Sequence, residues 1–160
     1  MMADHVDTIL AQWKTQRPDL DCSPMAVIGR LVRAKQIVNP KLDSVFKSFE
    51  LSSVEFDILA SMRRFGSPVT PTELYQTLML SSGAMSTRID GLVKRGFVER
   101  HASETDRRSC TITLTASGTT LIDEVVNAHV ENERQMLSSL SLDEQEQLAG
   151  LLRKWLIANE

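Results

Sequence analysis

The sequence has few of the residues that mark secreted, membrane-spanning or all-β proteins. Its 160 residues include 2 cysteines, Cys22 and Cys110, too few for a disulfide framework, which favours a reducing cytoplasm. No apolar run approaches the roughly 20 residues that span a bilayer, and the acidic start of the chain does not resemble a secretory signal. With 5% aromatic residues, 7 glycines and 5 prolines, the composition favours helices over a sandwich or barrel. We expect one compact, mainly helical domain.

Motifs of the common enzyme classes are also missing. The sequence contains no G-x-S-x-G, H-E-x-x-H or G-x-G-x-x-G motif and no phosphate-binding loop. His5, His101 and His129 are isolated and lack the spacing of metal ligands, so each is expected to be a surface or packing residue. The sequence therefore predicts a protein that is not an enzyme and that needs no cofactor or metal.

Positive charge is concentrated in the middle of the chain, although the net charge is −3. Residues 61–115 carry 8 basic and 5 acidic groups, whereas residues 116–160 carry 3 basic and 8 acidic groups. A basic middle between acidic ends permits one face to bind a polyanion such as double-stranded DNA. The charge distribution allows DNA binding without demonstrating it.

Two helix-start signals lie close together before the basic segment. Ser52 and Glu55 form a capping box, and Thr70 and Glu73 repeat it with Pro71 at the first helical position. The two signals predict two short helices, the second over 71–79, separated by a turn at 65–68. A third helix is predicted over 82–95, and Gly96 ends it.

Alternating residues after Gly96 indicate a β-hairpin. Residues 97–101 and 110–114 are the predicted strands, and the polar segment 103–109 joins them. Three short helices followed by such a hairpin form a winged helix-turn-helix. The fold class is thus mainly α with a small β-hairpin (α+β), in which 82–95 is the recognition helix and the hairpin is the wing.

Apolar stripes in the flanking helices exceed what one small winged module can cover. Helices are predicted over 4–16, over 24–48 with Ser23 as N-cap, from Thr115 to about 138, and after a capping box at Ser141. Pro40 is expected to kink or split the second of them. The surplus predicts an intertwined homodimer, with 1–50 and 116–160 as the helical dimerisation region and 51–115 as the DNA-binding region of one compact domain.

The predicted DNA interface follows from the chemistry of the recognition helix and wing. The helix begins without a carboxylate in its first turn, so its free N–H groups favour a phosphate, and small hydroxyl residues permit close approach in the major groove. An arginine at the wing tip suits the narrow minor groove, and Asp106 would orient Arg108 by a charge-assisted hydrogen bond. The predicted DNA-binding residues are Ser81, Ser82, Ser86, Thr87, Arg88, Arg107 and Arg108.

These segments resemble the MarR family of bacterial regulators. The resemblance covers 24–157 and rests on SSGAMSTRIDGLVKRGFVER, on the D-x-R wing Asp106-Arg107-Arg108 and on LTASG at 114–118. It implies a cytoplasmic, nucleoid-associated homodimer that binds a pseudo-palindromic operator, usually as a repressor released by a small ligand. By that resemblance Arg108 is the arginine that enters the minor groove, with Arg107 beside it.

The extra N-terminal helix with its tryptophan is similar to the urate-responsive branch of that family. The ligand residues of that branch correspond here to Trp13, Asp57, Arg88 and Arg100. An aromatic wall, two cations and an orienting acid suit a flat anionic heterocycle such as urate or a related purine. The bland alternative is that Trp13 packs in a dimer, Asp57 and Arg100 are surface charges and Arg88 contacts phosphate.

Other functions remain open from the sequence. Cys22 lies just before a predicted helix start, a position typical of reactive cysteines, so a redox sensor that switches through Cys22 is one alternative trigger. A phenolic effector is another. A pure interaction module would leave the arginine-rich wing and the uncharged start of the recognition helix without a purpose.

Overall fold

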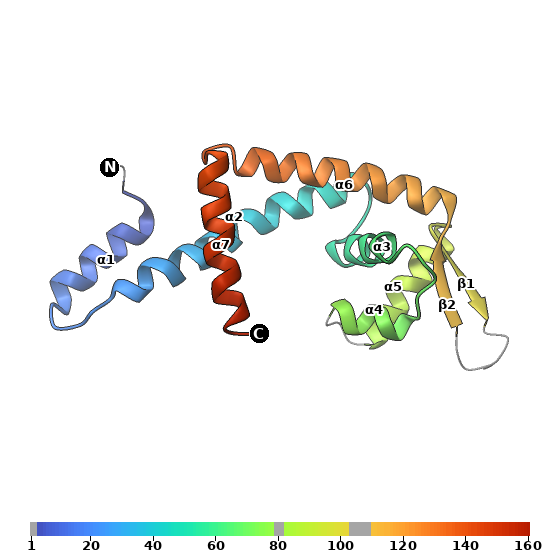
Figure 1. Ribbon diagram of the computed structural model, residues 1–160, viewed down its shortest axis with the longest axis horizontal. Helices are drawn as coiled ribbons and strands as arrows, with labels where there is room; N and C mark the ends of the chain where they lie inside the picture. The colour runs from blue at the N-terminus through green and yellow to red at the C-terminus, as the bar shows by residue number, and fades with distance from the viewer. Residues whose placement is uncertain (1–2, 79–81, 103–109) are drawn as a thin grey trace. The chain divides into compact units, whose positions relative to one another are not determined.

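The structure is a computed structural model that describes residues 3–78, 82–102 and 110–160 (Figure 1). The chain forms two compact units, Met1–Lys41 and Leu42–Glu160. The boundary between them falls within helix α2 (Ser23–Ser48).

Helix α1 (His5–Gln16) and the first part of α2 form the N-terminal unit. Asp4 caps α1 in a capping box with Asp7, and both carboxylates accept hydrogen bonds from Arg30 of α2, at 2.9 and 2.8 Å. Val6 is buried, and a Cβ at Gly29 would lie 3.3 Å from its Cγ1. The glycine therefore lets α1 and α2 approach closely.

Helix α2 starts one residue earlier than predicted, and Pro40 does not split it. Ser23 is the first helical residue rather than the cap, because the Asp21 carboxylate accepts the Ser23 N–H at 2.9 Å. Pro40 does not split the helix, which runs unbroken from Ser23 to Ser48. Proline removes one hydrogen bond, to the Gln36 carbonyl, and Pro40 is exposed, so water is available to that carbonyl.

The second unit contains a winged helix-turn-helix followed by two helices, which confirms the predicted fold class. Its strands pair antiparallel, from Val98 opposite Leu114 to Ala102 opposite Cys110, and Val69 adds a bridge to Ile112. The elements are α3 (Ser53–Phe65), α4 (Pro71–Leu78), α5 (Ser82–Lys94), β1 (Val98–Ala102), β2 (Cys110–Leu114), α6 (Ala116–Met136) and α7 (Leu142–Ile157).

The helix boundaries follow the predicted capping signals. Ser52 and Glu55 form a capping box at α3, as do Ser141 and Glu144 at α7. Thr70 and Glu73 exchange the same pair of hydrogen bonds at α4. These contacts satisfy backbone N–H groups that a helix start leaves without partners.

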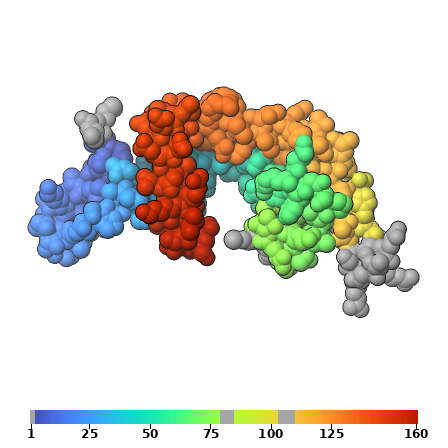
Figure 2. Space-filling model, in the orientation of Figure 1, coloured from blue at the N-terminus to red at the C-terminus, as the bar shows by residue number. Residues whose placement is uncertain are grey.

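Apolar side chains from α3, α4, α5, both strands and α6 form one core. Figure 2 shows α3 and α4 (green) directly against the hairpin (yellow) and α6 (orange), whereas α7 (red) stands apart from α3 and α4. Gly118 of α6 makes the tightest approach, because a Cβ there would lie 2.0 Å from the Phe97 carbonyl oxygen. The fully buried side chains include Ile58, Leu59, Leu74, Met85, Ile89, Leu92, Ile112, Ile122, Val98 and Val125.

Candidate nucleic-acid interface and effector site

Helix α5 is positioned by its buried side. Met85, Ile89 and Leu92 are at most 1% exposed, and α5 contacts α3, α4 and β1. This leaves Ser86, Thr87 and Arg88 exposed, as expected for a helix that reads DNA. Ser81 and the side chain of Ser82 lie outside the described residues.

The hairpin has two different faces. Val98, Arg100 and Ile112 share the face that packs on the core, since Val98 and Ile112 are buried and Arg100 lies opposite Ile112. On the other face the Thr113 hydroxyl lies 2.8 Å from His101 Nε2 and 3.2 Å from a carboxylate oxygen of Glu99. The predicted wing residues Asp106, Arg107 and Arg108 lie outside the described residues.

Asp57 stands on α3 with an unfavourable environment for its charge. The residue is exposed on one side, yet burial raises the pKa of its carboxyl, and the charges of Arg64 and His129 only partly oppose this. Carboxyls with raised pKa values are common at functional sites and less so at ordinary surface positions. Asp57 thus combines an exposed position with a raised pKa, which keeps it a candidate for the effector site.

Arg88 stands on the flank of α5 beside the buried stripe, where it acts on the start of α3. Burial raises the pKa of Glu55, but hydrogen bonds from Ser52 outweigh burial and leave that pKa lowered. The charges of Arg95 and Arg88 lower it further. Arg88 is thus close enough to α3 to influence a carboxylate two residues from Asp57.

Arg100 is paired with an acid that the sequence analysis did not single out. Its Nη2 donates to Asp90 Oδ1 of α5 at 2.6 Å, which links the wing strand to the recognition helix. The fourth predicted ligand residue, Trp13, lies on α1 in the other unit and is 40% exposed. The structure thus places Asp57, Arg88 and Arg100 on α3, α5 and β1 of one unit.

His129 of α6 is a packing residue with an unusual environment. Its ring lies 5.4 Å from the ring of Phe46 and 5.0 Å from that of Phe56, and its Nε2 lies 3.2 Å from Glu133. Its Nδ1 is buried and, within the described part of the chain, has no hydrogen-bond partner. Helical spacing of i, i+4 predicts the contact with Glu133, whereas the contacts with Phe46 and Phe56 depend on how other helices pack.

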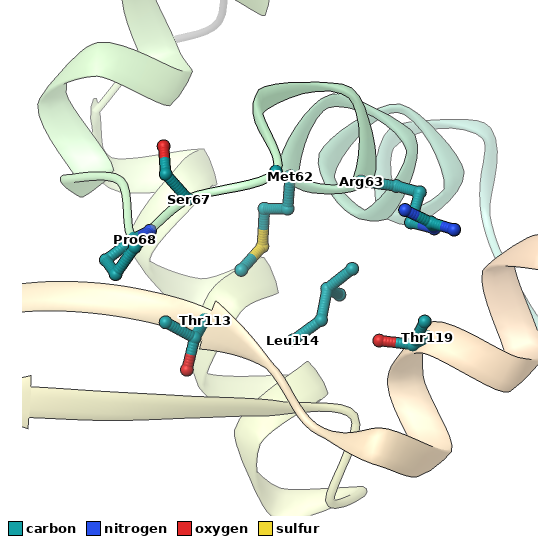
Figure 3. A pocket seen from close by; sticks show the side chains of 8 residues that line it. Met62, Arg63, Ser67, Pro68, Thr113, Leu114 and Thr119 are labelled. Carbon is teal, nitrogen blue, oxygen red and sulfur yellow. The ribbon is translucent and has the colours of Figure 1, made fainter.

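A hollow of about 250 Å³ opens between α3, the turn after it, β2 and α6 (Figure 3). Met62, Pro68 and Leu114 give it an apolar lining, and Arg63 stands at its side. The Arg63 guanidinium already donates to both carboxylate oxygens of Asp123, at 2.8 and 3.2 Å. The predicted effector residues do not line this hollow, so it is not the predicted site.

Two general expectations concern metals and membranes. Within residues 3–78, 82–102 and 110–160 there is no group of three or more His, Cys, Asp or Glu side chains that could hold a metal ion. None of the helices in the described part of the chain combines the length and hydrophobicity needed to span a bilayer.

Comparisons with known proteins point in one direction. Residues 49–109 match the MarR family. The chain is 44% identical to the HTH-type transcriptional regulator PecS of Dickeya dadantii over 92% of this chain and 90% of that protein. It is 30% identical to the multiple antibiotic resistance protein MarR of Escherichia coli, over 79% of this chain and 89% of that protein. A crystal structure of a mutant E. coli MarR complexed with operator DNA matches with a TM-score of 0.69 at 25% identity, over 90% and 97% of the two chains.

Proposed function

The chain belongs to the MarR family and is a PecS-like transcriptional regulator that binds DNA, and from this premise we propose that it acts as a homodimeric repressor. The dimer would bind a pseudo-palindromic operator and leave it when urate or a related anionic purine binds. The observation that carries the effector proposal is that α5, which holds Arg88, contacts both α3 and β1, the elements that hold Asp57 and Arg100.

The proposed DNA contacts divide between two grooves. Exposed Ser86, Thr87 and Arg88 enter the major groove with the start of α5, where Ser81 and Ser82 donate to phosphate. Arg108 enters the minor groove, oriented by Asp106, with Arg107 on the adjacent phosphate. These residues would set the register of each recognition helix on its half-site.

The proposed homodimer uses the terminal helices. Every residue of α7 is described and none is buried, although the helix carries Leu151, Trp155 and Ile157 at 68, 48 and 74% exposure. Leu151 and Trp155 share one face of the helix with Leu148, which is 43% exposed, and neighbouring exposed apolar side chains are typical of an interface. In a C2 dimer the same patch on both subunits would be covered.

The proposed effector site combines complementary chemistry. Arg88 and Arg100 supply cationic donors for a urate-like anion, Asp57 accepts from its N–H groups, and Trp13 provides an aromatic wall. Ligand held by residues of α5 and β1 would shift the recognition helix and the base of the wing. Half-sites about 34 Å apart tolerate little change in the spacing of the two recognition helices, so ligand and DNA binding oppose each other.

The test is release of operator DNA by purines. Binding to DNA from upstream of the protein's own gene is measured by fluorescence anisotropy while urate, xanthine or salicylate is added up to millimolar concentration. We expect urate to release the DNA and Arg100→Gln to abolish release, whereas Arg63→Gln, which removes an arginine of the same unit outside the site, leaves release intact. Absence of purine-driven release in the wild-type protein overturns the effector proposal.

Two further arms separate the alternative triggers. Release by salicylate but not by urate would favour a phenolic effector. Cys22 and Cys110 are both free and half-buried. Peroxide-driven release in the wild type that is lost in Cys22→Ser would favour the redox switch, while equal behaviour of the two proteins would exclude it.

A further inference from the structure

The position of Arg100 in the hairpin gives its side chain one direction. It alternates with buried Val98 on β1 and lies opposite buried Ile112 on β2, so it leaves the sheet on the face that packs on the core. Helix α5 contacts β1 on this face. The guanidinium therefore emerges beside α5, and it meets Asp90 there at 2.6 Å.

Asp90 and Arg88 occupy different flanks of α5. At 3.6 residues per turn, positions two residues apart lie about 200° apart around the helix. The buried stripe of Met85, Ile89 and Leu92 runs between them. Arg88 thus stands on one flank and Asp90 on the other, and the ion pair holds Arg100 on the flank away from Arg88.

We infer that Asp90 is a resident competitor for the effector: its carboxylate occupies the Arg100 guanidinium when the site is empty, and an anionic ligand must take Arg100 from it. This inference rests on the proposed function. Arg88 and Arg100 can hold one small anion only if Arg100 turns away from Asp90. Asp90 is a positioning residue in this scheme, because it acts through Arg100 and does not itself contact the ligand.

The ion pair between Arg100 and Asp90 is weak enough for a ligand to replace Asp90. It is a single charge-assisted hydrogen bond, and the two side chains are 35 and 55% exposed. Partly exposed ion pairs of this kind contribute little, whereas a bidentate or buried pair would resist exchange. Breaking the pair removes one polar link between β1 and α5, while their packing in the core remains.

The experiment measures urate binding to the free protein by isothermal titration calorimetry, without DNA. Asp90→Asn keeps the size of the side chain and removes its charge, so we expect urate to bind about two- to fivefold more tightly. Asp90→Glu restores the carboxylate and should return the affinity toward that of the wild type. Asp123→Asn is the matched control, because Asp123 is an exposed carboxylate of the same unit that pairs with Arg63 instead of Arg100, and its urate affinity should be unchanged.

Each outcome decides between the claims. Wild-type binding of urate with an unchanged affinity in Asp90→Asn overturns the competitor role and leaves the proposed function standing. An equal gain in Asp123→Asn also overturns it, since the effect would then be one of net charge. If neither the wild type nor Asp90→Asn binds urate, the effector proposal fails and this inference fails with it. The DNA affinity of each variant is measured in a separate experiment. It shows whether removing the Asp90 charge also reduces repulsion of the DNA phosphates.

Discussion

Helices α5 and α7 are of similar length, with 13 and 16 residues, but they use their apolar side chains in opposite ways. Helix α5 buries Met85, Ile89 and Leu92 almost completely in the core of its own chain. Helix α7 is described throughout and buries none of its residues, and its Leu151 is 68% exposed. Since most helical stability in proteins comes from packing of an apolar face, the two helices must depend on different partners.

The contrast separates what one chain can fix from what it leaves to an assembly. The orientation of α5 is set by contacts with α3, α4 and β1, so the face that reads DNA is defined within one subunit. The spacing between two such faces would be set by α7 and the other terminal helices. In the proposed dimer, an effector would then alter this spacing without unfolding the winged helix-turn-helix.

The largest expected effect is on the buried side of this comparison. Ile89→Ala removes a fully buried side chain and leaves a cavity, which should cost about 2–5 kcal/mol of unfolding free energy. Chemical denaturation followed by circular dichroism measures the loss. Leu151→Ala, at the same protein concentration, should cost less, and a greater cost at Leu151 would reverse the contrast between the helices.

The second-largest expected effect concerns α7, the exposed helix of the comparison. Leu151→Asp places a carboxylate in the proposed interface and should weaken self-association at least tenfold, while the circular dichroism of the helices is retained. Sedimentation velocity over a range of concentrations measures the association. Asp143→Asn, which alters charge on the same helix, serves as the control. A wild-type protein that stays monomeric at micromolar concentration would refute the assignment of α7 to an interface.

The third-largest expected effect concerns the wing of the winged helix-turn-helix. Arg108→Ala should lower operator affinity about tenfold and should reduce the slope of log affinity against log salt by about 1. Fluorescence anisotropy at several salt concentrations gives both quantities. Arg153→Ala, on α7, removes a positive charge far along the chain from the wing and should leave the slope unchanged. An unchanged affinity in Arg108→Ala would remove the wing arginine from the interface.

Local chemistry made most of the fold predictable. Helix caps act within a few residues, so spacing alone located them. The capping boxes at Ser52 and Ser141 mark the starts of α3 and α7, and Gly96 marks the end of α5. Of the two outcomes predicted for Pro40, a kink or a split, the split is absent, because one proline removes only one hydrogen bond of a long helix. Strand β1 begins at Val98, one residue later than predicted. The Phe97 N–H donates to the Leu92 carbonyl in the turn after α5, so Phe97 belongs to that turn.

The site was less predictable than the fold. Spacing alone places Arg88 beside Met85 and Leu92 on a helical wheel, at the edge of the buried stripe of α5. The partner of Arg100 could not be found in this way. Asp90 is ten residues away, and the contact exists because the hairpin turns the core-facing side of β1 toward α5. Such pairings depend on strand register and helix packing together, which a pattern in one segment does not encode.

The smallest expected effect compares two carboxylates within the second unit by their dependence on pH. Burial raises the pKa of Asp57, so the folded state prefers the protonated form, and this stabilisation is present at low pH and is lost as pH rises through the raised pKa. At pH 7, Asp57→Asn should therefore have a Tm about one degree above that of the wild type, and this gain should vanish near pH 3.5.

Asp123, in the same unit, should show the opposite dependence of stability on pH. A hydrogen bond from Arg63 lowers its pKa, so its stabilisation is present above the ordinary pKa of aspartate and is lost as pH falls through the lowered value. Asp123→Asn should lower Tm at pH 7, with the loss shrinking in acid. Differential scanning calorimetry of both variants at matched pH values measures the two trends. If Asp57→Asn follows the Asp123 trend, a favourable partner lowers the pKa of Asp57, which contradicts the raised direction.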